Sequence, residues 1–197
     1  ETPTVLCLKQ RLFIPRDETP ANIEGQGAIN QRELVKNALR MRPDRIVVGE
    51  VRGPEALDML QAMNTGHEGS LTTLHANSAR DALSRLETLV LLSGVELSQK
   101  SIREQIGAAF DLVVQIKRLT DGTRRVVSIT EVTGVQEGVI SMQEVFAFKP
   151  PGRHTACGIR PQAEIKIINA GLKLPEGMLI SVGREDDASP TGEGGLE

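Results

Sequence analysis

The sequence predicts an α/β fold in which a parallel central sheet carries an antiparallel hairpin extension. Helix-like and strand-like segments alternate up to about residue 110, and hairpin patterns with a strong Asp121-Gly122 turn follow. The 197 residues suffice for one α/β domain with a sizeable core. We expect residues 1–150 to form the main domain and 151–182 a C-terminal extension. Residues 183–197 are acidic and rich in glycine, which predicts a disordered tail.

The predicted helices are marked by apolar periodicity and by their end signals. They span about residues 31–42, 54–64, 79–93 and 99–110. The expected N-caps are Asn30, Ser78 and Ser98. Pro54 suits a first helical position, and Pro43 ends the first helix because proline cannot continue one. A short helix is also expected within 160–170, with Gly171 as its C-cap, although the isoleucines there would also suit a strand.

The predicted strands divide into a central group and a hairpin group. They span residues 4–14, 45–50, 69–75, 111–118, 124–132 and 138–148. The run Ile46-Val47-Val48 is β-branched without polar alternation, which predicts a strand buried on both faces. The last three segments follow one another through turns, as strands of an antiparallel meander do.

Composition disfavours several classes of protein. The net charge of -3, the absence of Trp and Tyr and the presence of only four Phe argue against a nucleic-acid partner. Cys7 and Cys157 lie far apart and form no CxxC, which argues against a disulfide framework or a zinc site and fits a reducing cytoplasm. No apolar run approaches the roughly 20 residues that span a bilayer. The chain begins with Glu1 rather than methionine, which suggests a fragment.

Glu50 is the first candidate for chemistry, because it closes the apolar run that precedes it. In α/β nucleotide enzymes, a carboxylate at the carboxyl end of a buried parallel strand lies beside Mg²⁺ or the attacking water. Any core strand can also end in glutamate for purely structural reasons. This feature alone does not decide between the two interpretations.

Residues 66–78 (GHEGSLTTLHANS) form the second candidate cluster. The hydroxyls of Thr72 and Thr73 and the imidazole of His75 fall between a strand end and a helix start, where polar groups can point at a bound phosphate. Each histidine is otherwise a satisfied core or surface residue. Zinc needs three or four convergent ligands, and His67 and His75 supply only two, so no metal site is expected.

Arginines at strand and helix ends form a third set, since such a residue can stabilise charge on the nucleotide of a neighbouring subunit. They are Arg42, Arg45, Arg52, Arg80, Arg85 and Arg103. Most charged side chains are simply solvated, and the sequence does not choose among the six.

Three contiguous motifs resemble the secretion ATPase superfamily of type II and type IV systems. They are NALRMRPDRIVVGEVRG at 37–53, EALDMLQAMNTGH at 55–67 and GSLTTLHAN at 69–77. Within the superfamily, the nearest resemblance is to the tight-adherence (Flp) pilus assembly ATPases, the TadA/CpaF type. It runs from about residue 17 to 150 and more weakly to 180.

The resemblance implies a partial RecA-like domain of the P-loop NTPase class, ATP hydrolysis with Mg²⁺, and a homo-hexamer at the cytoplasmic face of the inner membrane. Inner-membrane platform proteins of a secretion or pilus system would be its partners. Residues 46–50 are similar to the Walker B motif, which implies that Glu50 is the catalytic carboxylate. Residues 69–77 are similar to the His box, which implies that His75 lies near the γ-phosphate. Arg52 matches the arginine after the Walker B glutamate, and with Thr72 and Thr73 it is expected to contact nucleotide.

Two departures from the family pattern stand out. The phosphate-binding loop G-x-x-x-x-G-K-[ST] does not occur in the sequence. The family's Asp box would fall at about residues 1–6, where Glu1 is the expected nucleotide contact but Thr2 and Val5 replace acidic residues. The chain by itself is therefore expected neither to hydrolyse ATP nor to bind it tightly, because the loop supplies the phosphate cradle.

Three functions stay open at this point. The expected one is the C-terminal catalytic part of a secretion or pilus-assembly ATPase, which couples hydrolysis to movement of pilin or substrate. The missing loop favours the second, a scaffold that keeps the fold without turnover. The third, a RecA-like nucleic-acid motor, is disfavoured by the acidic charge and the scarce aromatics.

Overall fold

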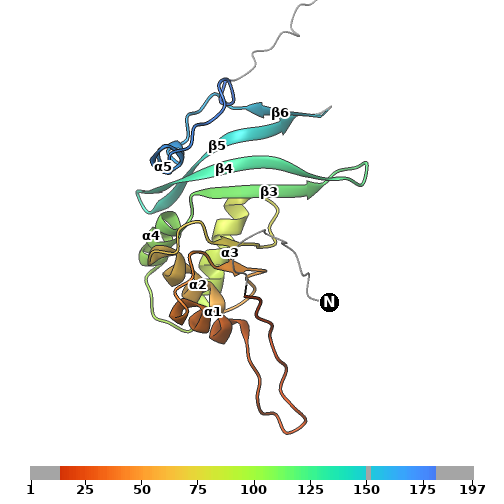
Figure 1. The fold of residues 1–197 in the computed structure, drawn as a ribbon, viewed down its shortest axis with the longest axis vertical. Coiled ribbons are helices and arrows are strands. Elements are labelled where there is room, and N and C mark those ends of the chain that lie inside the picture. The colour runs from red at the N-terminus through yellow and green to blue at the C-terminus, as the bar shows by residue number, and fades with distance from the viewer. Residues whose placement is uncertain (1–13, 150–151, 181–197) are drawn as a thin grey trace, which may run out of the picture. The chain divides into compact units, whose positions relative to one another are not determined.

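A computed structural model describes residues 14–149 and 152–180, which form two compact units (Figure 1). The first unit holds the described residues up to Val113 together with Val132–Met142. The second holds Val114–Glu131 and the described residues from Gln143 onward. Most of the strand expected at 4–14, the Glu1 site and the expected tail at 183–197 lie outside the described residues, and Ile14, which is described, is not in a strand.

Four helices of the first unit appear close to their predicted positions. They are α1 (Gln31–Arg40), α2 (Glu55–Asn64), α3 (Ala79–Leu91) and α4 (Gln99–Ala109). Asn30, Ser78 and Ser98 are confirmed as N-caps, and each side chain accepts a hydrogen bond from a backbone N–H three residues on. Asn30 and Glu33 form a reciprocal capping box. Pro54 is the N-cap of α2 rather than its first helical residue.

The core of the first unit is built around α2, which packs against α1, α3 and α4. Its buried apolar residues are Ala56, Leu57, Met59, Leu60 and Ala62. The predicted inward face of α3, with Leu83, Leu86, Leu89 and Val90, is confirmed. Burial of such side chains contributes roughly 1.5–3 kcal/mol each, which makes this helical layer the main source of stability for the unit.

Within the described residues, the parallel sheet has two short strands, β1 (Val47–Val48) and β2 (Leu71–Thr72), with Val47 paired to Leu71. The prediction of a strand buried on both faces was wrong. Val48 is 5% exposed, whereas Val47 and Leu71 are 43% and 53% exposed. One face of this sheet packs on the helical core. The Val47 and Leu71 side chains, on the other face, are exposed.

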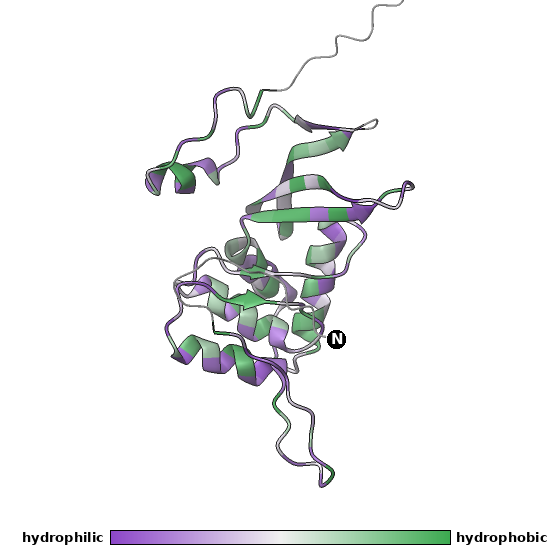
Figure 2. Ribbon diagram, turned by 45° about the vertical axis from the view of Figure 1, so that its right-hand side comes forward, coloured by the Kyte–Doolittle hydropathy of each residue, from purple (hydrophilic) through white to green (hydrophobic). Residues whose placement is uncertain are grey.

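The antiparallel extension is larger than predicted. Its strands are β3 (Leu112–Arg118), β4 (Arg124–Gln136), β5 (Val139–Lys149) and β6 (Arg153–Ala156), in that spatial order. The sequence analysis missed β6, which pairs antiparallel with β5. The turn at Asp121-Gly122 is confirmed, and Gly122 adopts a φ of 83° that favours glycine. β3 begins with three hydrophobic residues and alternates only after them (Figure 2), and its apolar residues Leu112, Val114 and Ile116 are exposed.

A buried carboxylate holds the last helix of the second unit. The short helix α5 (Glu164–Asn169) lies where it was expected, and Gly171 follows its end with a φ of 76°. Glu131 is 2% exposed and accepts hydrogen bonds from the Gln143 side chain at 2.6 Å and from the Ala163 backbone N–H at 2.7 Å. Because Ala163 is the N-cap of α5, this carboxylate fixes the start of the helix to β4.

Candidate functional site

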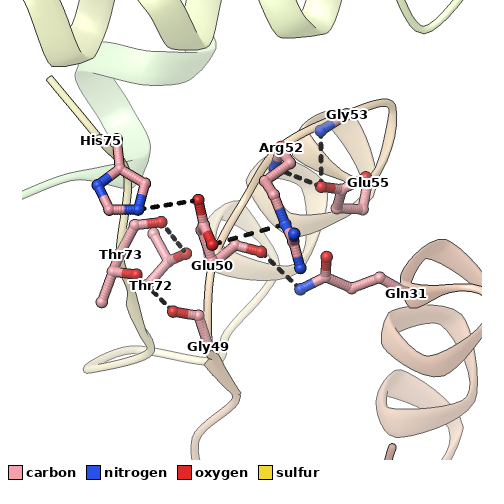
Figure 3. Close-up of polar contacts among 9 residues, drawn as sticks. All are labelled: Gln31, Gly49, Glu50, Arg52, Gly53, Glu55, Thr72, Thr73 and His75. Carbon is pink, nitrogen blue, oxygen red and sulfur yellow. Dashed lines mark hydrogen bonds and ion pairs between the residues drawn. The ribbon is translucent and has the colours of Figure 1, made fainter. Parts of the chain in front are cut away.

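The residues singled out from the sequence converge where β1 and β2 end (Figure 3). Glu50 follows β1 by two residues, and His75 follows β2 by three. Because the strands are parallel, their carboxyl ends meet at one edge of the sheet. This edge is where open α/β sheets bind ligands.

Glu50 lies between an imidazole and a guanidinium. Its Oε1 lies 3.3 Å from Nε2 of His75, and its Oε2 lies 3.5 Å from Nε of Arg52. The Glu50 side chain is 28% exposed, whereas the His75 side chain is 83% exposed. The carboxylate is therefore held by its neighbours, and the imidazole stays open to a ligand from solvent.

Backbone and hydroxyl contacts hold the two strand ends together. The Val51 N–H donates to the Thr73 carbonyl oxygen at 3.0 Å, and the Thr73 hydroxyl donates back to the Gly49 carbonyl oxygen. The Thr72 hydroxyl donates at 3.4 Å to the Thr73 carbonyl oxygen, which is a weak contact. Thr73 thus has a structural partner inside the site, and Thr72 has none as strong.

Gln31 was missed by the sequence analysis. Its side-chain Nε2 donates to the Glu50 carbonyl oxygen at 2.7 Å, while its own backbone N–H donates to Glu18 Oε1 at 2.9 Å. The next residue, Arg32, pairs at 2.6 Å with the buried Asp58 of α2. The first turn of α1 is thereby fixed to both β1 and α2. A polar residue just after a strong N-cap was the only sequence signal for this contact.

Glu55 was also missed, and it shapes the turn between β1 and α2. Its side chain is buried, and Oε1 accepts hydrogen bonds from the backbone N–H groups of Arg52 and Gly53 at 2.6 and 2.7 Å. A Cβ at residue 53 would lie 3.0 Å from Glu55 Oε2, so glycine leaves room for the carboxylate. An acidic residue directly after Gly53-Pro54, at a helix N-terminus, is the signal that could have revealed it.

The second histidine of the 66–78 cluster has a different place. His67 Nδ1 lies 3.1 Å from the carbonyl oxygen of Ala62, in the last turn of α2. The same helix-end carbonyl oxygen also accepts from the backbone N–H and the hydroxyl of Thr65, each at 3.2 Å. His67 is therefore a structural residue of the α2 end.

The six candidate arginines differ in their hydrogen-bond and ion-pair partners. Arg103 forms a bidentate pair with Glu87, at 2.9 and 3.1 Å, and donates to the Gly138 carbonyl oxygen. The hydrogen bond and charge of Glu87 raise the pKa of Arg103. Arg85 donates to the carbonyl oxygen of His75 at 3.1 Å. Arg103 thus has its bonding partners within its own unit, whereas Arg85 supports the His75 backbone.

Two kinds of feature are absent from the described residues. Between residues 14 and 149 and between 152 and 180, no three His, Cys, Asp or Glu side chains converge as metal ligands. No helix of that part of the chain is long and apolar enough to cross a bilayer.

Known proteins resemble this chain in sequence. It is 48% identical over 109 residues to a putative conjugal transfer protein of Mycobacterium tuberculosis, which covers 55% of this chain and 30% of that protein. It is 44% identical over 117 residues to the conjugal transfer protein TrbB of Rhizobium radiobacter, covering 59% and 35%. It is 40% identical over 100 residues to the type IV secretion system protein VirB11 of Bartonella quintana, covering 49% and 28%. The chain thus spans about a third of the length of these curated relatives.

A solved structure and a family model complete the comparison. The crystal structure of the VirB11 ATPase from the Brucella suis type IV secretion system, in complex with sulphate, matches 51% of this chain and 31% of that one. The TM-score is 0.48 and the identity 34%. The model of the Type II/IV secretion system protein family matches residues 15–168. Because this match covers most of the sequence, the chain belongs to the Type II/IV secretion system protein family.

Proposed function

We propose that this chain is the C-terminal catalytic part of a secretion ATPase, with a partial RecA-like fold, in which Glu50 and His75 act on the terminal phosphate of ATP. The observation that carries the proposal is the 3.3 Å contact between Glu50 Oε1 and His75 Nε2 at the carboxyl ends of two parallel strands. The names of the sequence relatives, a conjugal transfer protein and a type IV secretion system protein, support a role in secretion.

Each residue has a role that its position suits. Glu50 orients or deprotonates the attacking water, because its carboxylate sits on a rigid strand end and is partly open to solvent. His75 contacts the γ-phosphate, since its imidazole points from the next strand and is largely exposed. Arg52 and the Thr72 and Thr73 hydroxyls are the proposed nucleotide contacts, with Thr72 the freer of the two threonines.

Magnesium is proposed to enter with the nucleotide, as part of the substrate. Mg²⁺ in phosphoryl-transfer sites is usually held by one or two carboxylates together with substrate phosphates and water. Glu50 provides one such carboxylate. Among the described residues, no group of three His, Cys, Asp or Glu side chains converges on a metal position.

The finer assignments follow from the family resemblance. We propose a homo-hexamer that lies at the cytoplasmic face of the inner membrane, contacts membrane platform proteins and moves pilin or another substrate. A type IV secretion or conjugation role is the alternative, and it is favoured by the names of the relatives. Deleting the gene and scoring both piliation and conjugation in the same strain distinguishes these roles.

Turnover of the Glu50→Gln variant tests the proposed activity. The protein to use is a fusion that places the phosphate-loop segment of a related secretion ATPase ahead of residue 1. Glu50→Gln is expected to keep nucleotide binding and to lower turnover roughly 100-fold or more, as loss of a general base does. Glu68→Gln is the control, because Glu68 is exposed and near in sequence. Turnover of Glu50→Gln within a few-fold of the parent fusion would remove the residue from the reaction. A parent fusion that binds nucleotide without turnover would favour the scaffold alternative.

A further inference from the structure

A long arm projects from the first unit, ahead of α1. It comprises residues 17–30, and both views show it extending away from the helices (Figures 1 and 2). Thr19 and Ile29 close its base through two backbone hydrogen bonds, of 3.0 and 2.9 Å. Four residues of extended chain reach about 13 Å, so the tip lies well beyond this base.

The arm has a structured tip. Asn22 Oδ1 accepts hydrogen bonds from the backbone N–H groups of Glu24 and Gln26, at 3.1 and 2.8 Å. Two backbone bonds also close the tip, from Asn22 to the Gln26 carbonyl oxygen and from Gly25 to the Asn22 carbonyl oxygen. Within this turn Ile23 is fully exposed, at 107%. A fixed turn that holds an isoleucine and a carboxylate side by side in water is suited to docking, because little conformational freedom remains to be lost.

A groove of complementary character lies on the outer side of α1. Its volume is about 270 Å³, and its lining residues are Arg16, Leu34, Asn37, Arg40 and Met41. Leu34 and Met41 supply apolar surface, and Arg16 and Arg40 supply positive charge. In the described part of the chain, neither guanidinium forms an ion pair with a carboxylate.

We propose that the arm tip of one copy of this chain docks into the α1 groove of a second copy. Ile23 covers Leu34 and Met41, and the Glu24 carboxylate pairs with Arg16 and Arg40. The match is one of charge and polarity: an apolar and an acidic side chain meet a groove with apolar and basic lining. This inference concerns the contact between copies and does not depend on ATP hydrolysis.

The contact has a defined symmetry. The tip and the groove are different surfaces, so the interface between copies is heterologous. Each copy inserts its tip into one neighbour and receives the tip of another neighbour in its groove. Heterologous contacts close into rings when the rotation between copies permits. The arm base also reaches the candidate site, because Glu18 accepts from the N–H of Gln31 and Gln31 donates to the carbonyl oxygen of Glu50. Docking of a neighbouring copy at the tip would therefore affect the candidate functional site through α1.

Cross-linking between different copies tests the contact. In a Cys7→Ser, Cys157→Ser background, one chain carries Ala21→Cys beside the tip, which leaves Ile23 in place, and a second carries Asn37→Cys in the groove. Mixing the two with a short bismaleimide is expected to give covalent dimers. The control replaces the groove chain with Lys100→Cys, an exposed residue of α4. Dimer yields equal to this control would overturn the proposal.

Charge reversal makes the test specific. Glu24→Arg on the tip chain, or Arg40→Glu on the groove chain, is expected to lower the yield, and combining the two is expected to restore it. Failure of the combination to restore the yield, while both chains keep their circular dichroism spectra, would contradict the pairing.

Sedimentation of the unmodified chain gives a second measurement. Ile23→Ser is expected to weaken self-association about tenfold or more, as loss of a buried isoleucine does. A chain that remains monomeric up to roughly 1 mM, or that associates equally well with Ile23→Ser, would show that the tip does not hold copies together.

Discussion

Gln31 Nε2 lies 2.7 Å from the carbonyl oxygen of Glu50, and this hydrogen bond ties the first turn of α1 to the end of β1. The donor is the first residue of a helix whose second residue, Arg32, pairs with the buried Asp58. The backbone of the proposed catalytic carboxylate is therefore held by a side chain from a neighbouring element. Gln31 thereby holds the backbone from which the Glu50 side chain extends.

We expect Gln31→Ala to release this support. A net contribution of about 1 kcal/mol per hydrogen bond predicts a loss of that size in the free energy of unfolding. In the fusion with a phosphate-loop segment, turnover is also expected to fall several-fold while nucleotide affinity changes little. Urea denaturation and steady-state kinetics measure the two effects. The matched control is Gln61→Ala, an exposed glutamine of α2. Equal behaviour of the two variants would contradict the role of Gln31.

The Glu55 carboxylate is expected to be the main stabiliser of the β1–α2 turn. Glu55→Ala leaves the N–H groups of Arg52 and Gly53 without their acceptor, which costs about 1–3 kcal/mol of unfolding free energy. Glu55→Gln keeps an oxygen acceptor in place and should cost less. Chemical denaturation of both variants beside Glu96→Ala, an exposed glutamate, checks the order. A loss no greater than that of Glu96→Ala would show that water replaces the carboxylate.

The sequence located the helices well, because their signals are local. The caps Asn30, Ser78 and Ser98 and the apolar face of α3 depend on residues within a few positions of each other. The capping hydrogen bonds and the side-chain periodicity involve residues that are close in sequence. The extent of strand burial was misjudged because burial depends on what covers a sheet. Val47 has the residue type of a core strand, yet 43% of it is exposed.

The sequence predicted which residues belong to the candidate site, but not the hydrogen bonds that connect them. Glu50, Arg52 and His75 were each singled out, and the structure brings them within ion-pair distance. The sequence did not predict the contacts by which Gln31 and Glu55 support this site. Gln31 meets Glu50 across 19 positions of sequence, and only the packing of α1 creates that proximity.

The Asp121 carboxylate should make the hairpin turn weakly dependent on pH. Hydrogen bonds from the Thr123 hydroxyl and backbone N–H lower the pKa of Asp121 below its ordinary value. A lowered pKa in the folded state contributes stability above the unfolded-state pKa, and this contribution is lost as the pH falls through the folded-state pKa. Thr123→Ala is expected to move the pKa of Asp121 upward, while Thr123→Ser keeps it low. Carboxyl-carbon NMR titration measures both, and an unchanged value in Thr123→Ala would contradict the assignment to the hydroxyl.

His75 and His67 provide a paired test, because the structure gives them opposite environments. The His75 side chain is 83% exposed and faces Glu50, so its removal should not unfold the chain. His67 is half-buried and contacts the Ala62 carbonyl oxygen, so its removal should lower the unfolding free energy by about 1 kcal/mol. The two histidines therefore separate an effect on the reaction from an effect on the fold.

In the fusion that carries a phosphate loop, His75→Ala is expected to lower kcat at least tenfold while nucleotide affinity changes less. A group that meets the γ-phosphate chiefly as charge develops stabilises the transition state more than the bound substrate. His67→Ala is expected to lower Tm and leave kcat near that of the parent protein. Phosphate release, nucleotide titration and thermal denaturation of both variants give the comparison. A fall in affinity without a fall in kcat would make His75 a ground-state contact. Kinetics of His75→Ala equal to those of the parent would leave the Glu50–His75 pair with no part in the reaction.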